Sequence, residues 1–150
     1  MLRTGLVIAI TTVAVGGAIT GSGVTGAQAK AQIDAQLASG AIPAHAAPTT
    51  ASTAEQLAVS TYLSKRGAVF YGAWWCPACL AQKSLFGKEG AALLPYVECD
   101  KTDAGRQRCV AAKIRAFPTW ELDGKRLEGV QSVEELKVWS GYPGGSAQAN

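Results

Sequence analysis

Two cysteines separated by two residues stand directly between a strand pattern and a helix pattern, and no other feature constrains the fold as strongly. Residues 68–71, Ala-Val-Phe-Tyr, are typical of a short buried strand. Cys76 and Cys79 follow this run, and Pro77 between them suits the first turn of a helix, where a backbone N–H has no partner to lose. The sequence therefore predicts a strand-to-helix junction with both sulfurs at the start of the helix.

The remaining patterns predict an α/β fold in the order β-α-β-α-β-β-α, preceded by an extra N-terminal helix. Asp123-Gly124 is a strong two-residue hairpin signal. The first β-α-β unit is expected to be parallel and right-handed, so the sheet has four strands of mixed direction with helices on both faces. The expected elements are helix 53–66, strand 68–71, one helix from 77 that includes Phe86, strand 96–99, helix 104–114, strands 119–122 and 125–128, and helix 133–140.

The position of the Cys-x-x-Cys motif indicates thiol–disulfide chemistry. Free N–H groups at a helix N-terminus favour a thiolate, so Cys76 is expected to be the exposed thiol of low pKa and the nucleophile. Cys79, one turn later, is expected to be shielded and to displace the mixed disulfide formed at Cys76. A purely structural disulfide and a four-cysteine zinc site are the alternatives, although Cys99 and Cys109 lack the close spacing of zinc ligands.

Composition excludes several other functions. The chain has 150 residues, enough for one ordinary domain, and its net charge of +3 is too weak to indicate nucleic-acid binding. His45, in a stretch rich in Ala, Pro and Thr, is the single histidine. No catalytic nucleophile–histidine pair or histidine metal cluster can therefore be built, and we expect neither a metal nor a cofactor.

The sequence divides into four parts. Residues 1–29 resemble a secretory signal peptide ending in an Ala-x-Ala cleavage site, with an uncleaved membrane anchor as the alternative. Residues 30–52 are expected to be a flexible linker, 53–142 the folded domain, and 143–150 a disordered tail. Either interpretation of the first part places the domain outside the cytoplasm, in the periplasm or thylakoid lumen, secreted or anchored to the membrane.

The motifs together resemble the thioredoxin family, in particular the thioredoxin-like domain associated with cyanobacterial and plant vitamin K epoxide reductase homologues. The resemblance covers about Val69 to Tyr142. It is carried by segments 71–79, 82–83, 85–89, 94–100, 117–121 and 131–136, among them Trp75-Cys76-Pro77-Ala78-Cys79 and Phe117-Pro118-Thr119.

The resemblance implies a thioredoxin fold and an exported enzyme that passes disulfides to cysteine-containing exported proteins. The membrane-embedded vitamin K epoxide reductase homologue would be its partner, and Trp75, Phe117 and Pro118 would dock the client. Two departures matter: Ala78 stands where such domains often have histidine, and Phe70 where thioredoxins have a buried acid. A disulfide reductase and a non-catalytic binding module on the same scaffold remain alternatives.

Further residues have less specific expectations. Cys99 and Cys109 are expected to form a second disulfide, either structural or a redox relay, because exported chains tend to oxidise their cysteines. Aromatic residues near a small core more often pack than bind, which applies to Trp74 and Trp120 and leaves Trp75 open. Solvated positions are predicted for a remaining set of charged residues, Lys83, Lys88, Glu98 and Asp100.

Overall fold

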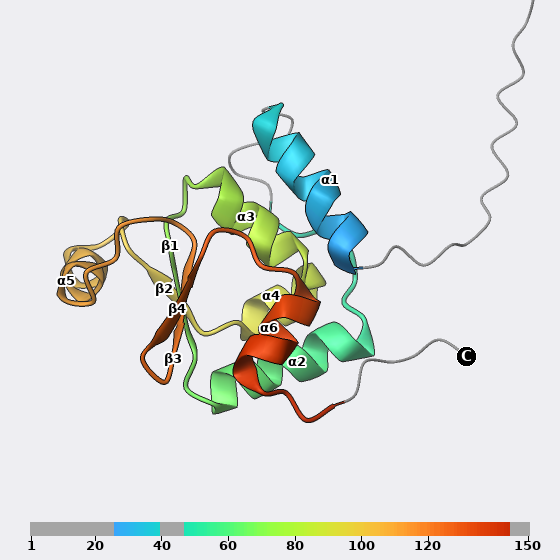
Figure 1. The fold of residues 1–150 in the computed structure, drawn as a ribbon. Helices are drawn as coiled ribbons and strands as arrows, with labels where there is room; N and C mark the ends of the chain where they lie inside the picture. Colours follow the sequence, from blue (N-terminus) through green and yellow to red (C-terminus); the bar gives the residue numbers. More distant parts are fainter. Residues whose placement is uncertain (1–25, 40–46, 145–150) are drawn as a thin grey trace, which may run out of the picture.

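A computed structural model describes residues 26–39 and 47–144, which fold around one four-stranded sheet (Figure 1). The strands lie in the order β2-β1-β3-β4. They are β1 (Val69–Gly72), β2 (Tyr96–Glu98), β3 (Thr119–Leu122) and β4 (Lys125–Glu128). β1 and β2 are parallel, whereas β3 runs antiparallel to both β1 and β4. The predicted mixed sheet and the thioredoxin-like fold are confirmed.

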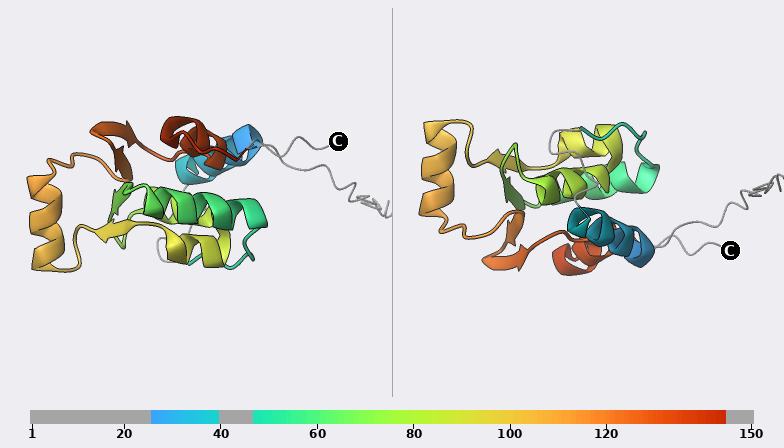
Figure 2. Two further views of the ribbon diagram at one scale, coloured as in Figure 1. Left: turned by 90° about the horizontal axis from the view of Figure 1, so that it is seen from below. Right: turned by 90° about the horizontal axis from the view of Figure 1, so that it is seen from above.

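Helices cover both faces of the sheet, as expected. Figure 2 shows α5 by itself on one side and the other helices of the domain on the opposite side. The helices of the domain are α2 (Ala54–Lys65), α3 (Pro77–Ser84), α4 (Gly87–Leu93), α5 (Asp103–Ala111) and α6 (Val133–Ser140). The larger core lies on the side of α2, α3, α4 and α6, and contains Val59, Leu63, Phe70, Phe86, Trp120, Leu122 and Leu136.

Local signals in the sequence set several element boundaries. Thr53 begins α2 and Ser132 begins α6 with complete capping boxes, in which the cap side chain and the residue three positions later exchange hydrogen bonds. The hairpin turns through Asp123 and Gly124, both with positive φ, as a tight two-residue turn between twisted strands requires. Gly141 ends α6 in the left-handed conformation.

The single helix predicted from Pro77 through Phe86 is wrong, because the chain breaks there into α3 and α4. α3 ends at Ser84, and Gly87, the first residue of α4, adopts a φ of +69°, which turns the chain between the two helices. Ser52 holds the break in place: its hydroxyl donates to the Phe86 carbonyl (2.8 Å) and accepts from the Gly90 N–H (2.8 Å). Phe86 is still fully buried, but at the junction of two helices.

The helix predicted for residues 104–114 is shorter than expected. α5 ends at Ala111, and Lys113 then takes a φ of 54°. Ile114 therefore leaves the helix to pack on the smaller core, whereas Val110 is 75% exposed. The apolar spacing of these two residues does not mark one buried helix face.

The predicted flexible linker, 30–52, includes ordered segments where the structure describes it. Helix α1 (Gly26–Ala38) crosses its start and lies beside α3 (Figure 1), and the ammonium of Lys30 pairs with Glu135 of α6 at 3.2 Å. Thr50 and Ser52 at its end are hydrogen-bonded to α4. The cleavage or anchoring of residues 1–29 and the tail fall largely outside the described residues. Within the described ranges, no helix combines the length and apolar character needed to cross a bilayer.

Candidate active site: the Cys76–Cys79 pair

Both cysteines of the motif are free thiols at the junction of β1 and α3. Cys76 is the N-cap of α3, and its sulfur accepts the Cys79 N–H at 3.2 Å. The Cys79 thiol donates to the Cys76 sulfur at 2.8 Å. The helix start thus directs two hydrogen bonds at one sulfur, and the second sulfur lies close enough to close a disulfide.

These bonds lower the pKa of Cys76 to about 7. The Cys79 thiol has the largest effect, the N–H groups of Cys79 and Ala78 add to it, and burial opposes them. The pKa of Cys79 is raised, because its proton bonds to Cys76 and because it is buried. The geometry supports the predicted roles of nucleophile and resolving thiol. Cys76 is nevertheless only 5% exposed, so the exposed thiol that we expected lies just beneath the surface.

Aromatic side chains frame Cys76. Trp75 is 44% exposed, and its ring lies edge-on to Phe117 with centroids 6.2 Å apart. The indole N–H of Trp75 donates to Asp100 at 2.7 Å, and Asp100 also pairs with Arg106. The sequence analysis predicted a solvated position for Asp100. Its carboxylate instead holds the indole of Trp75 in place.

The segment containing Phe117 and Pro118 lies beside the thiol pair, as the resemblance implies. The bond between Phe117 and Pro118 is cis, and the Phe117 carbonyl is 3.9 Å from the Cys76 sulfur. The Pro118 side chain is less than 2% exposed in this structure. Docking of a client by Trp75, Phe117 and Pro118 stays a prediction.

Cys99 and Cys109 form the second disulfide that we expected. It joins the residue after β2 to α5, and both cysteines are almost completely buried. A four-cysteine zinc site is contradicted, because these sulfurs are already bonded to each other. Among the residues that the structure describes, no other group of metal-ligating side chains is brought together.

The sequence analysis missed a group of three charged or polar residues near Cys79. They are Lys83, Tyr96 and Glu98. Lys83 lies over the Tyr96 ring, with its nitrogen 3.4 Å from the centroid, and the Tyr96 hydroxyl donates to Glu98 at 2.6 Å. The predicted solvated positions of Lys83 and Glu98 are therefore wrong. Lys83 follows Cys79 by four residues, which places both on one helix face, and this spacing was the available signal.

A buried glutamine on α3, Gln82, is a fourth residue whose role the sequence analysis missed. The Gln82 amide nitrogen donates to the Gln131 carbonyl at 2.8 Å, and its oxygen accepts from the Gln131 N–H at 2.7 Å and the Trp120 indole at 3.2 Å. Trp120 is fully buried and stacks on Phe70, so its packing role is confirmed. Gln82 thereby joins the cysteine-bearing helix to the loop before α6.

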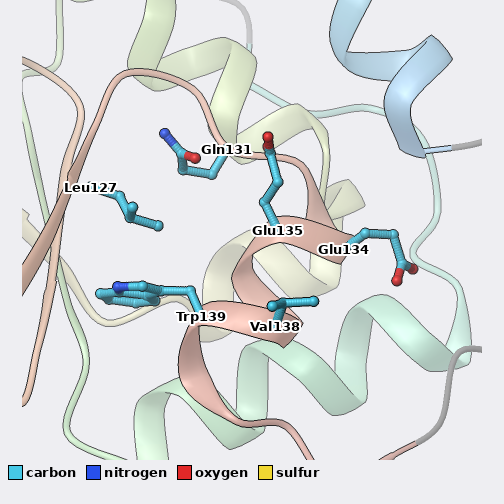
Figure 3. A pocket seen from close by; sticks show the side chains of 6 residues that line it. All are labelled: Leu127, Gln131, Glu134, Glu135, Val138 and Trp139. Carbon is cyan, nitrogen blue, oxygen red and sulfur yellow. The ribbon is translucent and has the colours of Figure 1, made fainter.

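An apolar hollow of about 440 Å³ lies between β4 and α6. Figure 3 shows the side chains of Leu127, Val138 and Trp139 around it, with carboxylates at its rim. None of the four cysteines lines this hollow.

A comparison with curated proteins finds similarity to a plant enzyme. The chain is 38% identical over 99 residues to the thiol-disulfide oxidoreductase LTO1 of Arabidopsis thaliana. The matched part covers 63% of this chain but only 26% of the plant protein, so the chain spans about a quarter of that relative's length. No family model matches the chain. The similarity and the paired thiols together support a thioredoxin-like oxidoreductase.

Proposed function

We propose that this protein is a thiol–disulfide oxidoreductase that works outside the cytoplasm and donates disulfides to exported proteins. The observation that carries the proposal is the pair of free thiols with opposite pKa shifts, Cys76 lowered to about 7 and Cys79 raised. A sulfur at a helix N-terminus next to a second, shielded sulfur suits repeated opening and closing of a disulfide. The named activity of the plant relative supports the same chemistry.

Disulfide donation starts from the oxidised Cys76–Cys79 pair. A client thiolate attacks Cys76, and Cys79 leaves and takes up a proton. A second client thiolate then attacks the client sulfur, closes the client disulfide and releases Cys76 as a thiolate. Two electrons pass from the client to the pair. The low pKa of Cys76 favours this direction, because a more stable thiolate leaves faster and stabilises the reduced pair.

The reduced pair must then be oxidised again. We propose that a membrane-embedded, quinone-linked oxidase of the vitamin K epoxide reductase type accepts its electrons. The resemblance to domains associated with such enzymes supports this partner. The partly exposed Trp75 beside Cys76 offers an apolar contact for either a client or the oxidase.

Trapping mixed disulfides in the native host tests the proposal. In a Cys79→Ser variant the bond formed at Cys76 cannot be resolved, so complexes with clients and with the oxidase should accumulate. Cys76→Ser is the matched control and should trap nothing. Recovery of only a cytochrome-assembly factor or a transmembrane reductant, without folding clients, would show a reductase instead.

A further inference from the structure

Cys79 needs a proton acceptor each time it closes the disulfide, and a donor each time the disulfide opens. Its raised pKa makes this step slow unless a neighbouring group takes the proton. Phe70, which is fully buried on β1, has no acidic group that could exchange this proton. The polar groups near Cys79 come instead from the next strand and from the helix that carries the cysteine.

Gly72 brings the next strand within reach. A β-carbon placed on Gly72 would lie 2.8 Å from the Cys79 sulfur and 2.9 Å from the Tyr96 ring, so both side chains flank the space that this glycine leaves empty. The register pairs Phe70 with Tyr96 and Gly72 with Glu98. Because alternate residues of a strand share a face, Tyr96 and Glu98 both project toward α3.

Hydrogen bonds connect these residues into one group. The Tyr96 hydroxyl donates to one oxygen of Glu98 at 2.6 Å, and the other oxygen accepts the Asp100 N–H at 2.9 Å. Lys83 completes the group from α3, with its ammonium 3.4 Å from the centre of the Tyr96 ring. The cation is partly buried and close enough to Cys79 for the two charges to interact.

We propose that Glu98 accepts the Cys79 proton through the Tyr96 hydroxyl, while Lys83 favours the resulting thiolate. This inference rests on the proposed function. The Cys79 proton passes to the Tyr96 oxygen as the Tyr96 proton passes to Glu98. The Cys79 sulfur then attacks Cys76 in the mixed disulfide, the Cys76–Cys79 bond forms, and the client sulfur leaves as a thiolate. Disulfide opening runs the same transfer backwards.

The surrounding charges are compatible with this assignment. Lys83 faces Glu98 and Cys79 from α3, and Cys76 is the other titratable group beside Cys79. Asp100, in the loop after β2, touches Glu98 through its backbone, and its carboxylate is paired with Arg106 of α5. Burial and the bond to Glu98 raise the pKa of Tyr96, so its hydroxyl stays protonated and can pass a proton on.

A single-turnover reaction of the full-length reduced protein with a nitrobenzoate disulfide separates the two thiols. Attack by Cys76 releases one coloured thiolate, and displacement by Cys79 releases the second in a first-order step. Tyr96→Phe keeps the ring under Lys83 and beside Phe70, and removes only the hydroxyl. We expect Tyr96→Phe and Glu98→Gln to slow the second phase at least about tenfold near pH 7, and to leave the first unchanged.

The pH profile distinguishes proton transfer from a structural role. In the wild-type protein the second phase should change little between about pH 6 and 8, whereas in both variants it should rise steeply because hydroxide must replace Glu98. Lys83→Met should slow the second phase without changing how its rate depends on pH. Matched controls are Tyr62→Phe, whose hydroxyl bonds carbonyls near Gly141, and Glu128→Gln, which is exposed on β4.

Two results would overturn the proposals separately. In the first, the wild-type protein closes its disulfide, but Tyr96→Phe and Glu98→Gln do so at a rate within about twofold of the wild-type rate and with the wild-type pH profile. The proton-transfer assignment then fails and the proposed function stands. If the wild-type protein shows no second phase, the proposed function itself fails.

Discussion

Replacing Gln82 with leucine should destabilise the protein although the two side chains have similar sizes. The amide of Gln82 makes three hydrogen bonds, with the Trp120 indole, the Gln131 N–H and the Gln131 carbonyl. Each buried polar group left without its partner costs about 1–3 kcal/mol. Two effects reduce the total cost: water can reach the partly buried Gln131 groups, and leucine adds apolar contacts. We therefore expect the free energy of unfolding to fall by about 3 kcal/mol.

Urea unfolding of the full-length protein measures this loss, with the slope of the transition as a check that the unfolded state is unchanged. Gln107→Leu, on the exposed side of α5, is the matched control and should change the free energy of unfolding by less than about 0.5 kcal/mol. A loss below about 1 kcal/mol for Gln82→Leu at an unchanged slope would refute the reasoning, because it would mean that the three bonds do not stabilise the fold.

Two further predictions concern the cysteines. Iodoacetamide should alkylate Cys76 of the reduced protein far faster than Cys79, at a rate that rises with pH through about 7 as the Cys76 thiolate forms; faster labelling of Cys79 would reverse the assignment. The double variant Cys99→Ala/Cys109→Ala should lose about 2–3 kcal/mol of unfolding free energy, because the bond closes a loop with a sequence separation of 10. An unchanged urea midpoint would show that this disulfide does not stabilise the fold.

Local chemistry explains what the sequence predicted well. The capping boxes at Thr53 and Ser132 and the hairpin turn at Asp123 each depend on residues within four positions of one another. The strand, cysteine pair and helix start are also contiguous. These features are therefore visible in a single sequence without knowledge of what packs on them.

Contacts between distant segments explain what the sequence did not show. The break between α3 and α4 depends on Ser52, which lies 38 residues before its partner Gly90. Lys83 and Glu98 resemble surface residues in sequence, and only the pairing of β1 with β2 places them together. Burial of the Pro118 side chain likewise follows from tertiary packing and not from its position before a strand.

The bonds made by Ser52 bear on how the domain can be produced as a fragment. Capping alone would suggest a first residue at Thr53. Such a fragment would leave the Phe86 carbonyl and the Gly90 N–H without the hydroxyl that joins them, and it would remove the Lys88 N–H bond to Thr50. Expression boundaries for crystallisation or binding studies are therefore better set upstream of Thr50.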